Sequence, residues 1–151
     1  MTRGIKFDKR TMELIQLFDT ITGATTLDCV VFEEDDGSER ICYMVNRKDL
    51  GKAIGKNGIN VKKLREKLGK KIEVIAYSKE LNKFIRYLLY PAKIERVEEQ
   101  QRTDDKKVLI ITVRPKDKGI AIGKNGRNIK KANVFIQRHT DVDSMVINMN
   151  E

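Results

Sequence analysis

Apolar residues in this chain follow helical spacing in some segments and strand spacing in others, and the order of the segments is the same in both halves. A period near 3.6 residues indicates a helix, and a two-residue alternation or a short β-branched run indicates a strand. In the first half these patterns predict helices at residues 8–22, 47–54 and 59–68, and strands at 27–32, 40–45 and 71–77. In the second half they predict helices at 78–90, 115–122 and 127–139, and strands at 93–99, 107–113 and 145–149. Each half is therefore an α+β unit of the order helix–strand–strand–helix–helix–strand.

Residues that begin and end helices stand at the boundaries of these segments. Asp8 and Ser78 are placed to cap the first helix of each half. Gly23 is placed to stop the first of these helices. Pro115 suits the first position of a helix, where its missing N–H costs nothing.

The two halves are copies of one another. Thirteen of the 19 positions from 45 to 63 are identical to those from 113 to 131, at an offset of 68 residues. A self-match at a fixed offset defines the structural unit. We therefore predict two domains, residues 1–77 and 78–151. Because no Gly-, Ser- or Pro-rich linker separates them, we also predict that they keep a fixed relative orientation.

Each copy is built around an Ile-Gly-Lys-Asn-Gly loop that precedes a predicted helix. The glycines allow φ > 0 and a close approach of another backbone. A helix N-terminus gathers free N–H groups and positive dipole, which favour a phosphate, and the loop lysine adds a full positive charge. The loop therefore indicates an anion clamp. Asn-Gly is also ordinary turn chemistry, but that explanation fits one copy better than two copies with lysine at the same position.

The loop is not a nucleotide-binding P-loop. Gly51 could begin that motif, but Lys56 stands where its second glycine must be, and no Gly-Lys-Ser/Thr follows. The Gly-x-Gly-x-x-Gly pattern of dinucleotide-binding folds is absent as well.

Positive charge is concentrated around the two loops. The chain has a net charge of +9. Residues 47–71 carry ten Lys or Arg against two acids, and residues 114–138 carry eight against one. These stretches together carry +15, so the rest of the chain carries −6. This distribution favours a polyanionic partner over charged helix faces that serve only solvation.

Composition gives little support to an enzyme, a metal site or a membrane protein. Cys29 and Cys42 could lie near each other across a hairpin, and we expect both thiols to be reduced, as in the cytosol. One histidine, His139, offers neither a zinc site nor a nucleophile–base pair. No secretory signal and no run of membrane-spanning length is present. We therefore expect a cytoplasmic protein with no cofactor, no small-molecule substrate, no membrane contact and no catalytic residue.

The sequence Ile-Gly-x-x-Gly-x-x-Ile/Val, present in both copies, resembles the signature of the KH RNA-binding domain. The tandem arrangement and its spacing are most similar to the archaeal NusA-like transcription factors, over residues 7–149. Because the last strand ends each copy, the resemblance implies the type II KH topology. The sheet would then have three strands with the second at its centre, the first pair antiparallel and the last pair parallel, and helices on one face.

The resemblance also implies a mechanism and a set of site residues. Each loop would hold the backbone of about four nucleotides of single-stranded RNA, with their bases in an apolar groove beside it. The loop residues are Gly55, Lys56, Asn57 and Gly58 in the first copy and Gly123, Lys124, Asn125 and Gly126 in the second. Candidates for the groove, some of which would serve core packing instead, are Ile54, Val61, Ile122 and Ile129. Outer electrostatic attraction would come from Lys62, Lys63, Arg127, Lys130 and Lys131.

The implied function is RNA binding in transcription elongation or termination, with RNA polymerase as a partner. The chain departs from bacterial NusA because 151 residues leave no room for that protein's polymerase-binding N-terminal domain and OB-fold domain. Two alternatives stay open at this point. One is a KH factor in ribosome assembly or RNA processing. The other is a protein-interaction scaffold on RNA polymerase, using acidic residues such as Glu95, Glu98 and Glu99.

Overall fold

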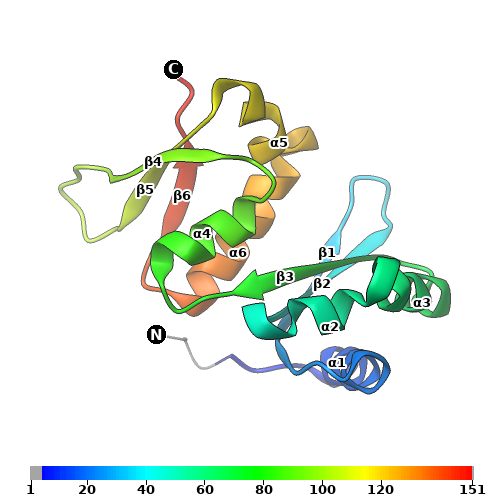
Figure 1. Ribbon diagram of the computed structural model, residues 1–151. Coiled ribbons are helices and arrows are strands. Elements are labelled where there is room, and N and C mark those ends of the chain that lie inside the picture. Colours follow the sequence, from blue (N-terminus) through cyan, green and yellow to red (C-terminus); the bar gives the residue numbers. More distant parts are fainter. Residues whose placement is uncertain (1–4, 151) are drawn as a thin grey trace. The chain divides into compact units, whose positions relative to one another are not determined.

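The computed structural model describes residues 5–150, which form two compact units, residues 6–78 and the residues from 79 onward (Figure 1). The first unit contains α1 (Lys9–Thr22), β1 (Thr26–Glu33), β2 (Glu39–Asn46), α2 (Leu50–Ile54), α3 (Ile59–Leu68) and β3 (Lys71–Tyr77), with 3₁₀ turns at Arg47–Asp49 and Lys56–Gly58. The second contains α4 (Leu81–Leu89), β4 (Ile94–Glu99), β5 (Val108–Val113), α5 (Lys118–Ile122), α6 (Arg127–His139) and β6 (Ser144–Ile147), with 3₁₀ turns at Pro115–Asp117 and Lys124–Gly126.

The first unit is a three-stranded mixed sheet with its helices packed on one face (Figure 1). The strand order is β1-β2-β3, with β1 and β2 antiparallel and β2 and β3 parallel. Alternate residues of β2, namely Ile41, Tyr43 and Val45, point into one core with Phe18 of α1 and Leu64 of α3. The predicted topology is therefore confirmed for this unit.

Tyr43 ties α1 to the centre of this sheet. Its ring stacks on Phe18 with the ring centroids 4.1 Å apart, and its hydroxyl donates a 2.9 Å hydrogen bond to the carbonyl of Leu14. Burial raises the pKa of this hydroxyl, so it stays a neutral donor at physiological pH. Packing and a satisfied polar group thus act together at the middle of the core.

The second unit repeats this architecture. Its strand order is β4-β5-β6, again antiparallel and then parallel, and α4 contacts α6 while α5 and α6 contact β6. Leu109, Ile111 and Val113 alternate along β5 and are buried, and Met145 on β6, the register partner of Leu109, is buried as well. The type II order expected from the resemblance is confirmed in both units.

Some local predictions were wrong. Ser78 does not cap α4, because that helix starts later and Glu80 occupies its N-cap position. The predicted helices before the loops begin instead as 3₁₀ turns and become α-helical only at Leu50 and Lys118. Pro115 does take the first position of its turn, as predicted. The caps at Asp8, which accepts a 2.7 Å hydrogen bond from the N–H of Thr11, and at Gly23 are confirmed.

The two cysteines lie on adjacent strands but point to opposite faces of the sheet. Cys29 is the register partner of Tyr43, whereas Cys42 is the partner of Val30, and side chains alternate along a strand. Both are buried, and neither forms a disulfide. None of the helices described is long and apolar enough to cross a membrane.

Candidate nucleic-acid interface

The two Gly-Lys-Asn-Gly loops have the same backbone conformation. In the first loop Gly55, Asn57 and Gly58 have φ values of 81°, 55° and 74°. The equivalent residues of the second loop have 78°, 55° and 76°. All lie in the region that favours glycine and that asparagine tolerates better than most residues. The repeated sequence is therefore a repeated shape, with each loop set between a short helix and a long one.

The first glycine of each loop is required for a steric reason as well. A Cβ placed on Gly55 would lie 2.9 Å from Cγ2 of Ile59 and 3.0 Å from the amide of Asn60. A Cβ on Gly123 would lie 2.8 Å from Cγ and 2.9 Å from the backbone nitrogen of Asn128. Nothing lies within 4 Å of a Cβ placed on Gly58. The first glycine thus lets the following helix approach. The second glycine is favoured only because its φ is positive.

An asparagine in each long helix fastens the loop to the preceding helix. Asn60 donates its side-chain amide to the carbonyl of Lys52 at 2.9 Å, and Asn128 donates to the carbonyl of Ile120 at 2.7 Å. This role was not predicted from the sequence. The signal was present, because asparagine stands at the same position in both repeats.

An aspartate before each loop-bearing pair of helices fixes it to the sheet. Asp117 accepts a 2.9 Å hydrogen bond from the N–H of Lys93, which precedes β4, and a 3.1 Å hydrogen bond from the guanidinium of Arg114. These contacts, the backbone N–H first, lower the pKa of Asp117. Its equivalent Asp49 accepts a longer bond, 3.4 Å, from the N–H of Thr25, which precedes β1. The loops are therefore held by matching contacts on both sides.

The loops leave backbone donors available. In each loop the N–H of the second glycine donates to the carbonyl of the first at 3.0 Å, which closes the turn. Among the hydrogen bonds of the described residues, none is donated by the backbone N–H of Lys56, Asn57 or Lys124. Donors of this kind at the start of a helix suit an anionic oxygen.

The positive charge around the loops is not neutralised by the protein. The side chains of Lys56, Lys62, Lys63, Lys124, Arg127 and Lys130 are exposed. Within residues 5–150 no ion pair involves any of these six. Their charge is therefore free to attract a polyanion.

Lys131 differs from this group. The prediction placed it in the outer electrostatic shell, but it is buried, with 9% of its surface exposed, whereas its repeat equivalent Lys63 is exposed. It lies on the side of α6 that carries the buried Ala132 and Phe135. It does not belong to an exposed basic shell.

The four apolar candidates flank the loops in similar surroundings. Ile54, Val61, Ile122 and Ile129 are all partly buried. Val61 packs against the core of the first unit, so core packing takes part of its surface. The remaining exposure of the four is what a shallow apolar groove beside each loop requires.

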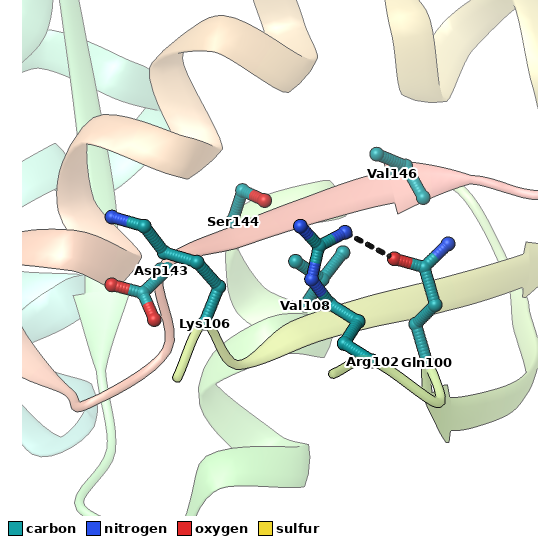
Figure 2. Close-up of a pocket in the computed structure, with 7 residues that line it drawn as sticks. All are labelled: Gln100, Arg102, Lys106, Val108, Asp143, Ser144 and Val146. Carbon is teal, nitrogen blue, oxygen red and sulfur yellow. Dashed lines mark hydrogen bonds between the residues drawn. The ribbon is translucent and has the colours of Figure 1, made fainter. Parts of the chain in front are cut away.

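An open depression elsewhere in the second unit does not share this chemistry (Figure 2). It has a volume of about 490 Å³ and is lined by Gln100, Arg102, Lys106, Val108, Asp143, Ser144 and Val146. Arg102 donates to Gln100 at 2.8 Å and pairs with Asp104 at 2.6 Å, so its charge is satisfied within the protein. The depression lies where β5 and β6 begin, whereas the loop follows the end of β5. Among the residues described, no three His, Cys, Asp or Glu side chains gather to hold a metal ion.

Comparisons with known proteins agree with this geometry. A family model described as KH domain matches residues 15–102, and one described as NusA-like second KH domain matches residues 81–148. Proteins named "Probable transcription termination protein NusA" are similar along most of their length. The one from Methanocaldococcus jannaschii is 35% identical, over 88% of this chain and 69% of its own. The one from Halobacterium salinarum is 33% identical, over 93% of this chain and 96% of its own. A solved structure, "Crystal structure of APE1850", is 37% identical with a TM-score of 0.80, over 94% of this chain and 100% of that one.

Proposed function

The chain belongs to the family of archaeal NusA-like proteins with KH domains, and from this premise we propose that it binds single-stranded RNA as a transcription termination factor. Its relatives carry the name of probable transcription termination proteins. The proposal is a binding role in the cytoplasm and includes no chemical reaction.

One observation carries the proposal: two loops of the same shape each present, at the start of a long helix, a lysine outside any ion pair and the undonated backbone N–H of that lysine. Such a loop fits a phosphodiester backbone, in which phosphates recur at regular spacing. Two matching sites on one chain fit a ligand that repeats. A compact anion would need only one of them.

We assign backbone clamping to the four residues of each loop. In this assignment Lys56 and Lys124 supply charge, and N–H groups donate to phosphate oxygens. Lys62, Lys63, Arg127 and Lys130 supply a salt-sensitive attraction around the clamp. Ile54, Val61, Ile122 and Ile129 form the apolar floor on which bases lie. Single-stranded RNA is the proposed ligand because only unstacked bases can enter such a groove.

The test is a fluorescence-anisotropy titration with single-stranded RNA of about a dozen nucleotides, at two salt concentrations, beside its DNA and duplex counterparts. Gly58→Asp adds bulk and negative charge to the clamp, so we expect affinity to fall at least tenfold. Gly69→Asp is the matched control, since Gly69 ends the same helix, has a similar φ of 63° and has nothing within 4 Å of its Cβ position. Equal affinity of the two folded variants would contradict the clamp.

A second part of the proposal is contact with RNA polymerase during elongation or termination. It rests on the names of the relatives and not on a surface of this structure. Pull-down of purified archaeal RNA polymerase by the tagged chain, with and without a nascent transcript, is the measurement. Retention that needs the transcript and intact loops would mean that RNA bridges the two. Absence of retention in both conditions would remove polymerase as a direct partner.

A further inference from the structure

The two loops are alike, but the side chains on either side of them are exchanged. Six of the 19 aligned positions differ between the repeats. At two of these aligned positions, one repeat has an exposed isoleucine where the other has an exposed basic residue. Before the first loop stands Lys52 and after it Ile59, while before the second loop stands Ile120 and after it Arg127. Each loop thus has one apolar and one basic neighbour, in opposite order.

The two isoleucines stand out among the helices around the loops. In α2, α3, α5 and α6, Ile59 and Ile120 are the only exposed apolar side chains, and all the others are buried or partly buried. Their exposures are similar, 44% and 45%. An isoleucine left in water forgoes the hydrophobic stabilisation that burial would give. Its position beside a basic loop suggests that a ligand with apolar faces covers it.

Contacts within each loop fix these positions. Ile59 lies directly against the first glycine of its loop, because its Cγ2 is 2.9 Å from the Cβ position of Gly55. In the second loop the three atoms nearest the equivalent position all belong to Asn128 and none to Arg127. The carbonyl of Ile120 accepts a 2.7 Å hydrogen bond from Asn128, which holds residue 120 beside the start of α6. The exposed isoleucine thus stands on α3 in one unit and on α5 in the other.

We propose that Ile59 in the first clamp and Ile120 in the second contact RNA bases and determine specificity, so that the two clamps prefer different nucleotide sequences. The inference rests on the proposed RNA binding. Phosphate contacts position a strand without reading its sequence, whereas base contacts specify it. The shared lysine, glycines and N–H groups account for the former. The exchanged isoleucine and basic residue place the base contact on opposite sides of a backbone held in the same way.

The test compares the RNA sequences that each clamp enriches from a random single-stranded pool. Gly126→Asp leaves only the first clamp active, and Gly58→Asp leaves only the second. Into the Gly126→Asp chain we would introduce the exchange Lys52→Ile with Ile59→Arg, which keeps the net charge and the number of apolar residues. The matched control is Lys9→Met with Met12→Lys, an exchange of an exposed basic and an exposed apolar residue on α1, which is neither a loop nor a helix that flanks one.

We expect the two single clamps to enrich different motifs. We also expect the exchange to move the first clamp toward the motif of the second, by about fivefold or more in relative enrichment, the size of one apolar contact. The control exchange should leave the motif where it was. If the two clamps enrich one motif, or if the exchange shifts nothing while RNA binding persists, the inference is overturned.

Two further measurements distinguish a failure of the base-contact inference from a failure of RNA binding itself. Ile59→Ala alone, in the Gly126→Asp chain, should flatten the motif of the first clamp. This covers the case in which the double exchange fails to fold, and an unchanged motif would overturn the inference. Failure of the unmodified chain to bind any single-stranded RNA would overturn the proposed function itself.

Discussion

At the scale of single residues, the two glycines of each loop are required for different reasons. Gly55 has a φ of 81° and side chains of α3 within 3.0 Å of its Cβ position, whereas Gly58 has a φ of 74° and nothing within 4 Å of that position. A side chain at Gly58 meets only backbone strain, but one at Gly55 meets strain and a clash at 2.9 Å. A Cβ on Gly123 would likewise clash at 2.8 Å, whereas one on Gly126 would make only ordinary contacts at 3.8 Å and beyond.

We therefore expect Gly58→Ala to lower the free energy of unfolding by about 1 kcal/mol and Gly55→Ala by about 3 kcal/mol. Urea unfolding at neutral pH measures both. Gly51→Ala is the control, because Gly51 lies in α2 with nothing within 4 Å of its Cβ position. That change should raise stability by about 0.5–1 kcal/mol through helix propensity. Equal losses at Gly55 and Gly58 would contradict the steric explanation.

A second prediction at this scale concerns pH. The guanidinium of Arg10 makes two hydrogen bonds to Glu39, and Lys70 makes a third contact, which together lower the pKa of Glu39 to about 2. The unfolded chain would have the ordinary value of 4.5. A pKa lowered by folding stabilises the protein above pH 4.5, and the contribution is lost as pH falls from 4.5 toward 2.

Glu39→Gln should thus reduce the melting temperature at pH 7 and change it much less at pH 2, where Glu39 is neutral in the unfolded chain and about half neutral in the folded one. Thermal unfolding followed by circular dichroism between these pH values is the measurement. Because Glu39 is partly exposed, the difference should shrink in high salt. A melting-temperature difference of the same size at pH 7 and pH 2 would show that Glu39 acts through packing instead.

At the scale of elements, the sequence was sufficient wherever one periodicity continued for several turns or residues. The helix ending at Leu68 and the strand from Lys71 to Tyr77 were predicted to the residue. The order of strands followed from where the last strand falls in each copy. The start of α4 was wrong because Ser78 is only one of several polar residues before Leu81, and a cap depends on backbone angles that composition does not fix.

The two loops of the site were predictable from the sequence, but the contacts that hold them were not. The loops could be found because the same sequence occurs twice. The roles of Asn60 and Asp117 depend on which carbonyl or N–H the fold brings near, through pairs separated by eight and 24 residues. The burial of Lys131 could not be seen either, because it follows from the side of α6 on which the residue lies.

The asparagine contact yields a prediction for the loop as an element. Asn128→Ala removes the hydrogen bond to Ile120 without changing charge. It should lower the free energy of unfolding by about 1 kcal/mol. It should also weaken RNA binding by the second clamp, because the loop is no longer fastened to α5. Asn82→Ala, an exposed position on α4, is the control and should change stability by less than about 0.5 kcal/mol. Unchanged RNA affinity of the folded Asn128→Ala chain, with the first clamp disabled by Gly58→Asp, would remove this asparagine from the site.

At the scale of the whole molecule, function depends on how two weak clamps combine. Joining two sites makes the second binding event intramolecular, so the combined affinity can exceed either one by about 10²–10⁴ without any new contact. The size of this gain depends on the length and stiffness of the connection. Here β3 ends at Tyr77 and α4 begins at Leu81, so only residues 78–80 lie between the last strand of the first unit and the first helix of the second.

We expect a flexible Gly/Ser insertion of about a dozen residues between Lys79 and Glu80 to weaken binding of a long single-stranded RNA, because the effective concentration of the second clamp falls as the linker lengthens. The loss should be about tenfold for an RNA that reaches both loops and absent for one that fills a single loop. Titration of the original and lengthened chains with RNAs of increasing length measures this. The same insertion in the Gly126→Asp chain is the control, since a chain with one clamp has nothing to couple. If the insertion leaves the affinity for long RNA unchanged, the clamps bind independently. The short connection between the two units would then add nothing to RNA affinity.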